Sequence, residues 1–149
     1  MRDWLRSKPH RRAAVVVATA PLVLGALAPA ELILEVRDLR NTNGLVHICL
    51  TQDPQHFPDC QGDPQALRRT VPAAQAGRIT LSWVSGQYAL ALVHDENGNG
   101  RLDTFLGIPR EGYGFSRNAP VRFGPPRFDD ARFTLQGQQT MVVNMRYTF

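Results

Sequence analysis

The chain has 149 residues, the size of a single domain, with 17 Lys and Arg against 13 Asp and Glu and a formal net charge of +4. Five of the 17 basic residues but only one of the 13 acidic residues lie in the first thirty positions, which leaves 12 of each sign in residues 31–149. The basic balance of the whole chain therefore gives no reason to expect nucleic acid or an acidic membrane as a partner.

Residues 1–30 have the order of a secretory signal peptide: a basic start, an uncharged apolar run at residues 13–28, and small residues that close it. The run is short for a membrane-spanning helix, and Pro21 interrupts it. We expect cleavage after Ala30, because a cut after Ala28 would leave proline first. An uncleaved anchor is the alternative. The sequence thus predicts a periplasmic or secreted domain at 31–149 that has no contact with a membrane after cleavage.

The first predicted strands lie at residues 31–39 and 44–51. Both alternate between apolar and polar side chains, although Ile33 breaks the alternation in the first. Between them, Asn41-Thr42-Asn43-Gly44 is a turn signal. We expect the two strands to form a hairpin.

Two cysteines, Cys49 and Cys60, flank a polar loop with two prolines. Because an exported protein meets an oxidising compartment, the pair is expected to form a disulfide. The alternative is zinc, with His47 and His56 completing a set of two sulfurs and two nitrogens.

Further strands follow along the chain. Residues 65–73 fit a short strand or a covering turn. Residues 78–84 alternate clearly, whereas residues 87–95 are apolar on both faces, which is typical of a central strand. Two more strands are expected at residues 131–137 and 140–149. About seven short strands separated by turns predict an all-β protein of two stacked antiparallel sheets, with a closed barrel as the alternative.

One long irregular segment, residues 95–128, stands apart from the strands. Loops of that length are uncommon unless something holds them. The segment begins with His-Asp-Glu-Asn-Gly-Asn-Gly-Arg-Leu-Asp at residues 94–103, where oxygen-bearing side chains recur at every second position.

This spacing resembles a calcium loop, in which alternate oxygens converge around a sharp glycine turn, here at Gly100. The candidate ligands are Asp95, Asn97, Asn99, Asp103 and the backbone carbonyl of Arg101. The twelfth position is Leu106 instead of the usual bidentate glutamate, and Glu96 or Glu111 reaches the loop only by another route of the chain. Binding is therefore expected to be weak, with a Kd of about 10⁻⁴–10⁻³ M. The alternative is a metal-free polar turn in which Asp95 bonds its own backbone.

The longer pattern, HDENGNGRLD followed by LGIPREGYGFSRNA and GPPRFDDARF, resembles the uncharacterised bacterial family catalogued as domain of unknown function 2141. The resemblance spans roughly Leu32 to Tyr147. It implies an exported, mostly β protein with an immunoglobulin-like or transthyretin-like sandwich, and it implies no known reaction.

Several residues of the irregular segment are expected to support the loop. Tyr113 and Phe115 are predicted to anchor it on the sheet, and Glu111 to pair with an arginine or to turn back to the Asp95 loop. The remaining support residues are His94, Gly100, Ser116 and Asn118.

No catalytic constellation is evident in the sequence, so a non-enzymatic interaction module with a protein or glycan partner is expected. Apart from the zinc alternative at the two cysteines, calcium is the candidate cofactor. A second hypothesis is a carbohydrate- or peptide-binding domain that uses Tyr113, Phe115, Phe123 and Phe128 with nearby arginines. A third is a small hydrolase with Asp95 and Asp103 as its acid and base.

Overall fold

The computed structural model describes residues 28–149. The predicted signal peptide lies outside the described residues except for its last three positions. Pro29 and Ala30 belong to the first strand, and the Ala30 side chain is buried. Within residues 28–149, no helix is long and apolar enough to cross a bilayer.

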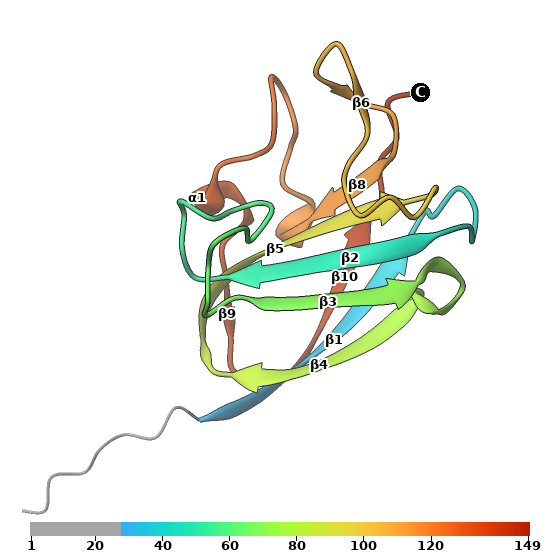
Figure 1. Ribbon diagram of the computed structural model, residues 1–149. Coiled ribbons are helices and arrows are strands. Elements are labelled where there is room, and N and C mark those ends of the chain that lie inside the picture. Colours follow the sequence, from blue (N-terminus) through green and yellow to red (C-terminus); the bar gives the residue numbers. More distant parts are fainter. Residues whose placement is uncertain (1–27) are drawn as a thin grey trace, which may run out of the picture.

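Eight strands form two packed sheets, as Figure 1 shows, which confirms the all-β sandwich prediction. The smaller sheet has the order β10-β1-β4, and the larger has the order β3-β2-β5-β8 with β9 also paired to β5. These strands are β1 (Pro29–Arg37), β2 (Leu45–Thr51), β3 (Leu67–Pro72), β4 (Arg78–Val84), β5 (Gly86–Asp95), β8 (Gly112–Phe115), β9 (Phe133–Leu135) and β10 (Gly137–Asn144). The remaining elements are the hairpin β6 (Thr104–Phe105) and β7 (Ile108–Pro109), the 3₁₀ turns η1 (Ala73–Gln75) and η2 (Ser116–Asn118), and the one-turn helix α1 (Phe128–Ala131).

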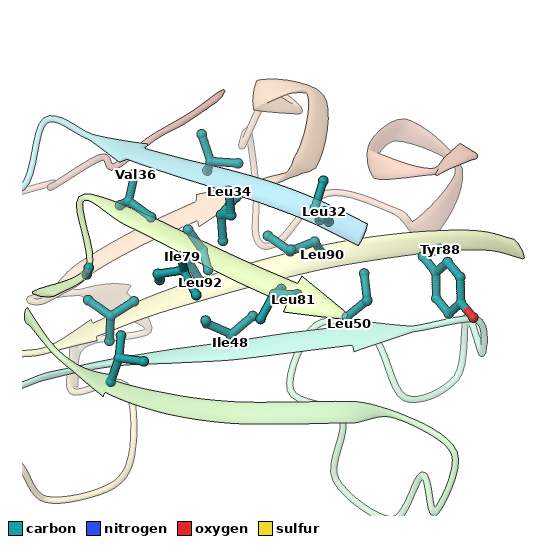
Figure 2. Close-up of a cluster of buried hydrophobic side chains, with 14 of the residues drawn as sticks. Leu32, Leu34, Val36, Ile48, Leu50, Ile79, Leu81, Tyr88, Leu90 and Leu92 are labelled. Carbon is teal, nitrogen blue, oxygen red and sulfur yellow. The ribbon is translucent and has the colours of Figure 1, made fainter. Parts of the chain in front are cut away.

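The main core lies between the two sheets and comes from residues of every sandwich strand except β8. Figure 2 shows part of this core. Leu32 and Leu34 of β1 pack there with Leu81 of β4 and with Leu90 and Leu92 of β5. All five side chains are buried. The alternation predicted for β1 and β4 thus gives each of them one buried face, because alternate residues of a strand point to the same side.

A second, smaller cluster covers the outer face of the larger sheet. Ala89 and Ala91 of β5 pack there with Phe115, Phe128 and the cysteine pair. The predicted central strand is therefore covered on both faces, as its sequence indicated.

The hairpin predicted for residues 31–51 is wrong. The first strand pairs with β10 and β4, whereas β2 pairs with β3 and β5 in the other sheet. The seven-residue connection at 38–44 crosses between the layers, and its turn signal marks that crossing. Gly44 makes the crossing feasible: its φ is +68°, and a Cβ there would lie 2.0 Å from the carbonyl oxygen of Asp95.

One strand pair departs from the expected antiparallel arrangement. The first and last strands, β1 and β10, run parallel over eight residue pairs from Ala30–Gly137 to Arg37–Asn144. Because they come from opposite ends of the sequence, no local turn sets their direction.

The cysteines form the predicted disulfide, with the Cα atoms of Cys49 and Cys60 5.6 Å apart. Their sulfurs are therefore not available together as zinc ligands. Cys60 is fully buried, and Phe57 from the same loop packs edge-on against Phe128.

Removing both cysteines in a Cys49→Ala, Cys60→Ala variant is expected to lower the free energy of unfolding by about 2–3 kcal/mol, because the open loop gains entropy in the unfolded chain. Urea unfolding of both proteins, with and without a thiol reductant, measures this change. The reductant is expected to destabilise the wild type and to leave the double variant unaffected. A wild type that is indifferent to reductant would contradict the prediction.

Candidate functional site

The carboxylate of Asp95 is the centre of the loop at residues 95–103. Asp95 ends β5 and is fully buried. Its Oδ1 accepts the backbone N–H groups of Gly98 (2.8 Å) and Asn99 (3.1 Å), and its Oδ2 accepts that of Gly100 (2.7 Å). Gly98 and Gly100 have φ of +72° and +82°, so the chain turns sharply enough for three consecutive N–H groups to face one side chain.

A histidine from the neighbouring strand also contacts this carboxylate. Nε2 of His47 lies 2.9 Å from Oδ2 of Asp95, and Nδ1 lies 2.8 Å from the hydroxyl of Thr70. Burial alone would raise the pKa of Asp95, but the hydrogen bonds from His47 and from the three backbone N–H groups outweigh it and lower that pKa. The loop is therefore tied to β2 and β3 through an ionised carboxylate.

The other candidate ligands bond to one another and to the loop backbone. The side-chain N–H groups of Asn97 and Asn99 donate to the two oxygens of Asp103, at 2.7 and 2.9 Å. Their own amide oxygens accept the backbone N–H groups of Asn99 and Arg101. The hydrogen bonds from Asn99 and Asn97 lower the pKa of Asp103. The structure thus brings the predicted side chains together in one network of hydrogen bonds.

Glu111 closes the loop from the far side. Its Oε1 accepts the backbone N–H of Glu96 at 3.0 Å, and its Oε2 accepts that of Asp103 at 2.9 Å. The side chain is buried. Of the two arrangements considered from the sequence, Glu111 adopts the one that turns back to the Asp95 loop.

A second polar cluster fixes the other side of the loop base. Glu96 accepts hydrogen bonds from Arg40 and Asn41, and the Arg40 guanidinium lies 4.5 Å from the centre of the Tyr147 ring. The Tyr147 hydroxyl lies 2.7 Å from Nδ1 of the fully buried His94. The Arg40 hydrogen bond, against the opposing effect of burial, lowers the pKa of Glu96. Residues from both ends of the domain therefore hold this loop.

The remaining predicted support residues bind the segment to the sheets and not to the calcium-like loop itself. Ser116 accepts the backbone N–H of Leu90 and donates to the carbonyl of Ala131. Asn118 accepts the backbone N–H of Asn144 at 2.8 Å. Tyr113 lies half-buried in β8, and Phe115 is buried in the outer cluster.

The β6–β7 hairpin extends from this base and ends in exposed apolar side chains. Relative exposures are 56% for Phe105, 87% for Leu106 and 43% for Ile108. Leu106 and Gly107 form the two-residue turn with φ of +50° and +78°. Asparagine or glycine is the usual occupant of the first of these positions, because a larger side chain is strained there.

A second loop, residues 119–127, also projects from the sandwich and carries the fully exposed Phe123. Arg122 and Arg127 line a shallow concavity beside it. The aromatic surface suggested by the sequence is not assembled, because Phe115 and Phe128 are buried beneath the disulfide loop. Phe123 is the only exposed phenylalanine of that set.

The side chains of the site are joined mainly by hydrogen bonds. Among residues 28–149, no three His, Cys, Asp or Glu side chains are arranged to hold a metal ion. The order Thr70, His47, Asp95 follows the connectivity of a nucleophile, base and acid. Asp95 is fully buried, however, and none of the three residues lines the concavities at residues 52–65 and 120–130.

Three residues of this site, His47, Arg40 and Tyr147, are not predicted as loop partners by the sequence. The sequence marks His47 only as a candidate zinc ligand, because its partner Asp95 lies 48 positions along the chain. The one available signal is that His47 lies on the outward face of its strand, where a polar partner is needed.

Comparison with known families identifies a match over most of the chain. The family described as an uncharacterised protein conserved in bacteria (DUF2141) matches residues 34–143. This range begins in β1 and ends in β10, so it includes the 95–103 loop and both projecting loops. No curated protein and no solved structure matches the chain.

Proposed function

This chain belongs to the DUF2141 family of uncharacterised bacterial proteins, and from that premise we propose that it is an exported, non-enzymatic interaction module. Its sandwich holds a rigid loop base, and that base presents the β6–β7 hairpin to a partner. The exposed apolar hairpin tip is the observation that carries this proposal.

The hairpin is well suited to recognition because its base is fixed. The backbone N–H of Arg110 donates to the carbonyl of Asp103 at 2.9 Å, directly beside the Glu111 bond to the Asp103 N–H. A binding element that is ordered before it meets its partner loses less conformational entropy on binding.

Leu106 strengthens the proposal. Its positive φ is unfavourable for leucine, and its side chain is 87% exposed, so it gains nothing from packing in the fold. Strain that the fold does not require points to a role outside the fold.

The two alternative functions have less support. A glycan-binding aromatic face needs exposed rings, and two of the four proposed rings are buried. A hydrolytic pair of Asp95 and Asp103 needs both carboxylates to reach a substrate, and Asp95 has no exposed surface.

Weak calcium binding by the 95–103 loop is the finer part of the proposal. The alternating oxygens of Asp95, Asn97 and Asn99 support it, and Glu111 brings a further carboxylate to the loop base in place of Leu106 at the twelfth position. These oxygens already accept N–H groups, so an ion has to replace hydrogen bonds, which is consistent with low affinity.

Calcium at 10 mM is expected to stabilise the fold by about 1.4–2.7 kcal/mol if the Kd is about 10⁻³–10⁻⁴ M. Thermal unfolding with calcium, with magnesium and with a chelator measures this effect. The Asn99→Ala variant, which lacks one candidate ligand, is expected to lose most of the shift. Identical melting with calcium and chelator would remove the ion and leave the hydrogen-bonded loop.

Site-specific photocrosslinking tests the module itself. A photoreactive residue at position 106 of the full chain, produced in bacterial cells, is expected to give adducts with an external molecule. The same residue at position 65, where the native Gln65 is also exposed but lies between Cys60 and β3, is the matched control. Equal labelling from the two positions, or none from either, would contradict the proposal.

A further inference from the structure

We infer that the partner of this surface is an anionic lipid surface, which the β6–β7 hairpin and the 119–127 loop penetrate with their tips. This inference rests on the proposed function and names the partner class of the same site. In the view of Figure 1 both loops rise from the same side of the sandwich as two separate projections.

The tips carry apolar side chains that have no partner in the fold. Leu106 is 87% exposed and Phe123 is fully exposed, and Phe105 and Ile108 flank the first tip. Side chains at convex tips insert readily into the boundary between lipid headgroups and acyl chains, where apolar area leaves water without a shaped pocket.

The two projecting segments carry more arginines than acidic residues, although Asp103, Asp129 and Asp130 flank them. Residues 104–128 contain four arginines and one acidic residue, Glu111, which is buried at the loop base. The exposed arginines are Arg110, Arg117, Arg122 and Arg127. Of these, only Arg127 has a carboxylate partner among the described residues, Asp130 at 3.4 Å. Guanidinium groups beside apolar tips complement the phosphates of anionic lipids.

A protein partner explains this arrangement less well. A stable protein interface buries roughly 800 Å² per partner in a continuous, closely packed patch. Here the apolar side chains occupy two separate tips, and the concavity beside Phe123 is lined mainly by proline, glycine and arginine. A fluid surface accommodates two separate tips, whereas a protein needs two pockets at the matching distance.

The prediction of no membrane contact rests on the total charge of the sequence, whereas this inference rests on how that charge is distributed. Residues 31–149 have a formal net charge of zero, and this total does not show how the arginines and the acidic residues are distributed along the chain. The exposed arginines of the two projecting segments are therefore the groups that would meet an anionic surface.

Position-specific fluorescence tests the inference directly. The full chain with Leu106→Trp is mixed with vesicles of phosphatidylcholine containing about 30% phosphatidylglycerol, a composition that supplies a negative surface potential. The wild-type spectrum, to which the two native tryptophans contribute, is subtracted. The remaining emission is expected to shift to shorter wavelength and to be quenched by brominated acyl chains.

The control for this probe is Thr80→Trp, because Thr80 is exposed on β4, which belongs to the smaller sheet. Its emission is expected to show neither the shift nor the quenching. A tryptophan at position 106 whose emission does not shift would overturn the inference.

Binding measurements use a variant whose fold is expected to be intact. Leu106→Asn places a residue favoured at positive φ in the same turn, so its fold is expected to be at least as stable as the wild type. Its affinity for the same vesicles is expected to fall about tenfold, because a leucine side chain no longer leaves water. Thr80→Asn is the matched control, and its affinity for the vesicles is expected to be unchanged. Because all three proteins carry the same residues 1–30, that segment cannot cause a difference between them. Sodium chloride at about 0.5 M is expected to weaken wild-type binding by screening.

The outcomes separate the lipid inference from the module proposal. If Leu106→Asn binds vesicles as well as the wild type while photocrosslinking at position 106 yields a protein adduct, the lipid inference fails and the module stands. If Leu106→Asn binds vesicles as well as the wild type and photocrosslinking at position 106 yields no adduct, both the lipid inference and the module proposal fail.

Discussion

Replacing Asp95 with alanine is expected to lower the free energy of unfolding by about 3 kcal/mol, one of the two largest effects of any single loop substitution. The carboxylate accepts three backbone N–H groups and faces His47, and hydrogen bonds to a charged group each contribute about 1.5–3 kcal/mol. The expected total is less than their sum, because an opened loop exposes some donors to water. Urea unfolding followed by far-ultraviolet circular dichroism measures the change.

Asp103→Ala is the matched control for this substitution. Asp103 is also a carboxylate of the loop, but it is half-buried, and its side-chain partners are the amides of Asn97 and Asn99 and the Arg101 guanidinium. Its removal is expected to destabilise the fold much less than the removal of Asp95, because polar pairs that water can reach contribute little. Equal destabilisation by the two alanine variants would show that Asp95 has no special position in the loop.

The pH dependence of the Asp95 effect follows from the direction of its pKa shift. The folded-state pKa of Asp95 is lowered, so its contribution is fully present above the unfolded value of about 3.9 and is lost as pH falls through the folded pKa. The stability difference between the wild type and Asp95→Asn is therefore expected to be largest near neutral pH and to shrink below about pH 4. A difference that grows towards acid pH would reverse the assigned sign.

The sandwich is predicted well from the sequence because its main signal is local. Alternation at Leu32, Leu34 and Leu81 depends only on which side of a strand faces the core, and each strand carries that information itself. Strand partners are different. The pairing of β1 with β10 joins residues more than one hundred positions apart, and no turn between them indicates it. The predicted hairpin failed for the same reason.

In the candidate site, too, the local features are predicted from the sequence and the contacts between distant residues are not. The Asp95 turn follows from glycine and asparagine spacing, so the sequence alone identifies it. The anchoring of that turn by His47, Arg40 and Tyr147 depends on how two sheets meet, and these residues have no common motif. The second hypothesis, with Phe115 and Phe128 as surface aromatics, does not anticipate their burial, because the disulfide loop that packs on them through Phe57 is mostly polar in sequence.

Replacing Glu111 with alanine is expected to lower the free energy of unfolding by about 2–3 kcal/mol, because two backbone N–H groups lose a charged acceptor at a buried position. Glu111→Gln keeps one carbonyl oxygen and is expected to lose about half as much. Unfolding in urea gives the two values. If the glutamine and alanine variants are both as stable as the wild type, Glu111 does not hold the loop.

Amide hydrogen exchange shows where the Glu111 effect falls. In Glu111→Ala, exchange at Glu96 and Asp103 is expected to rise by more than that at Leu92 in the core, because local opening requires less free energy than global unfolding. The hairpin tip at Leu106 lies between Asp103 and Glu111 in sequence, so the same contacts that protect these amides also orient the tip. Weaker vesicle binding by Glu111→Ala, without any change in the tip residues, is therefore expected, and it would show that the fold contributes to recognition by fixing the direction of the hairpin. Unchanged vesicle binding together with faster exchange at Asp103 would show that the tip acts independently of its base.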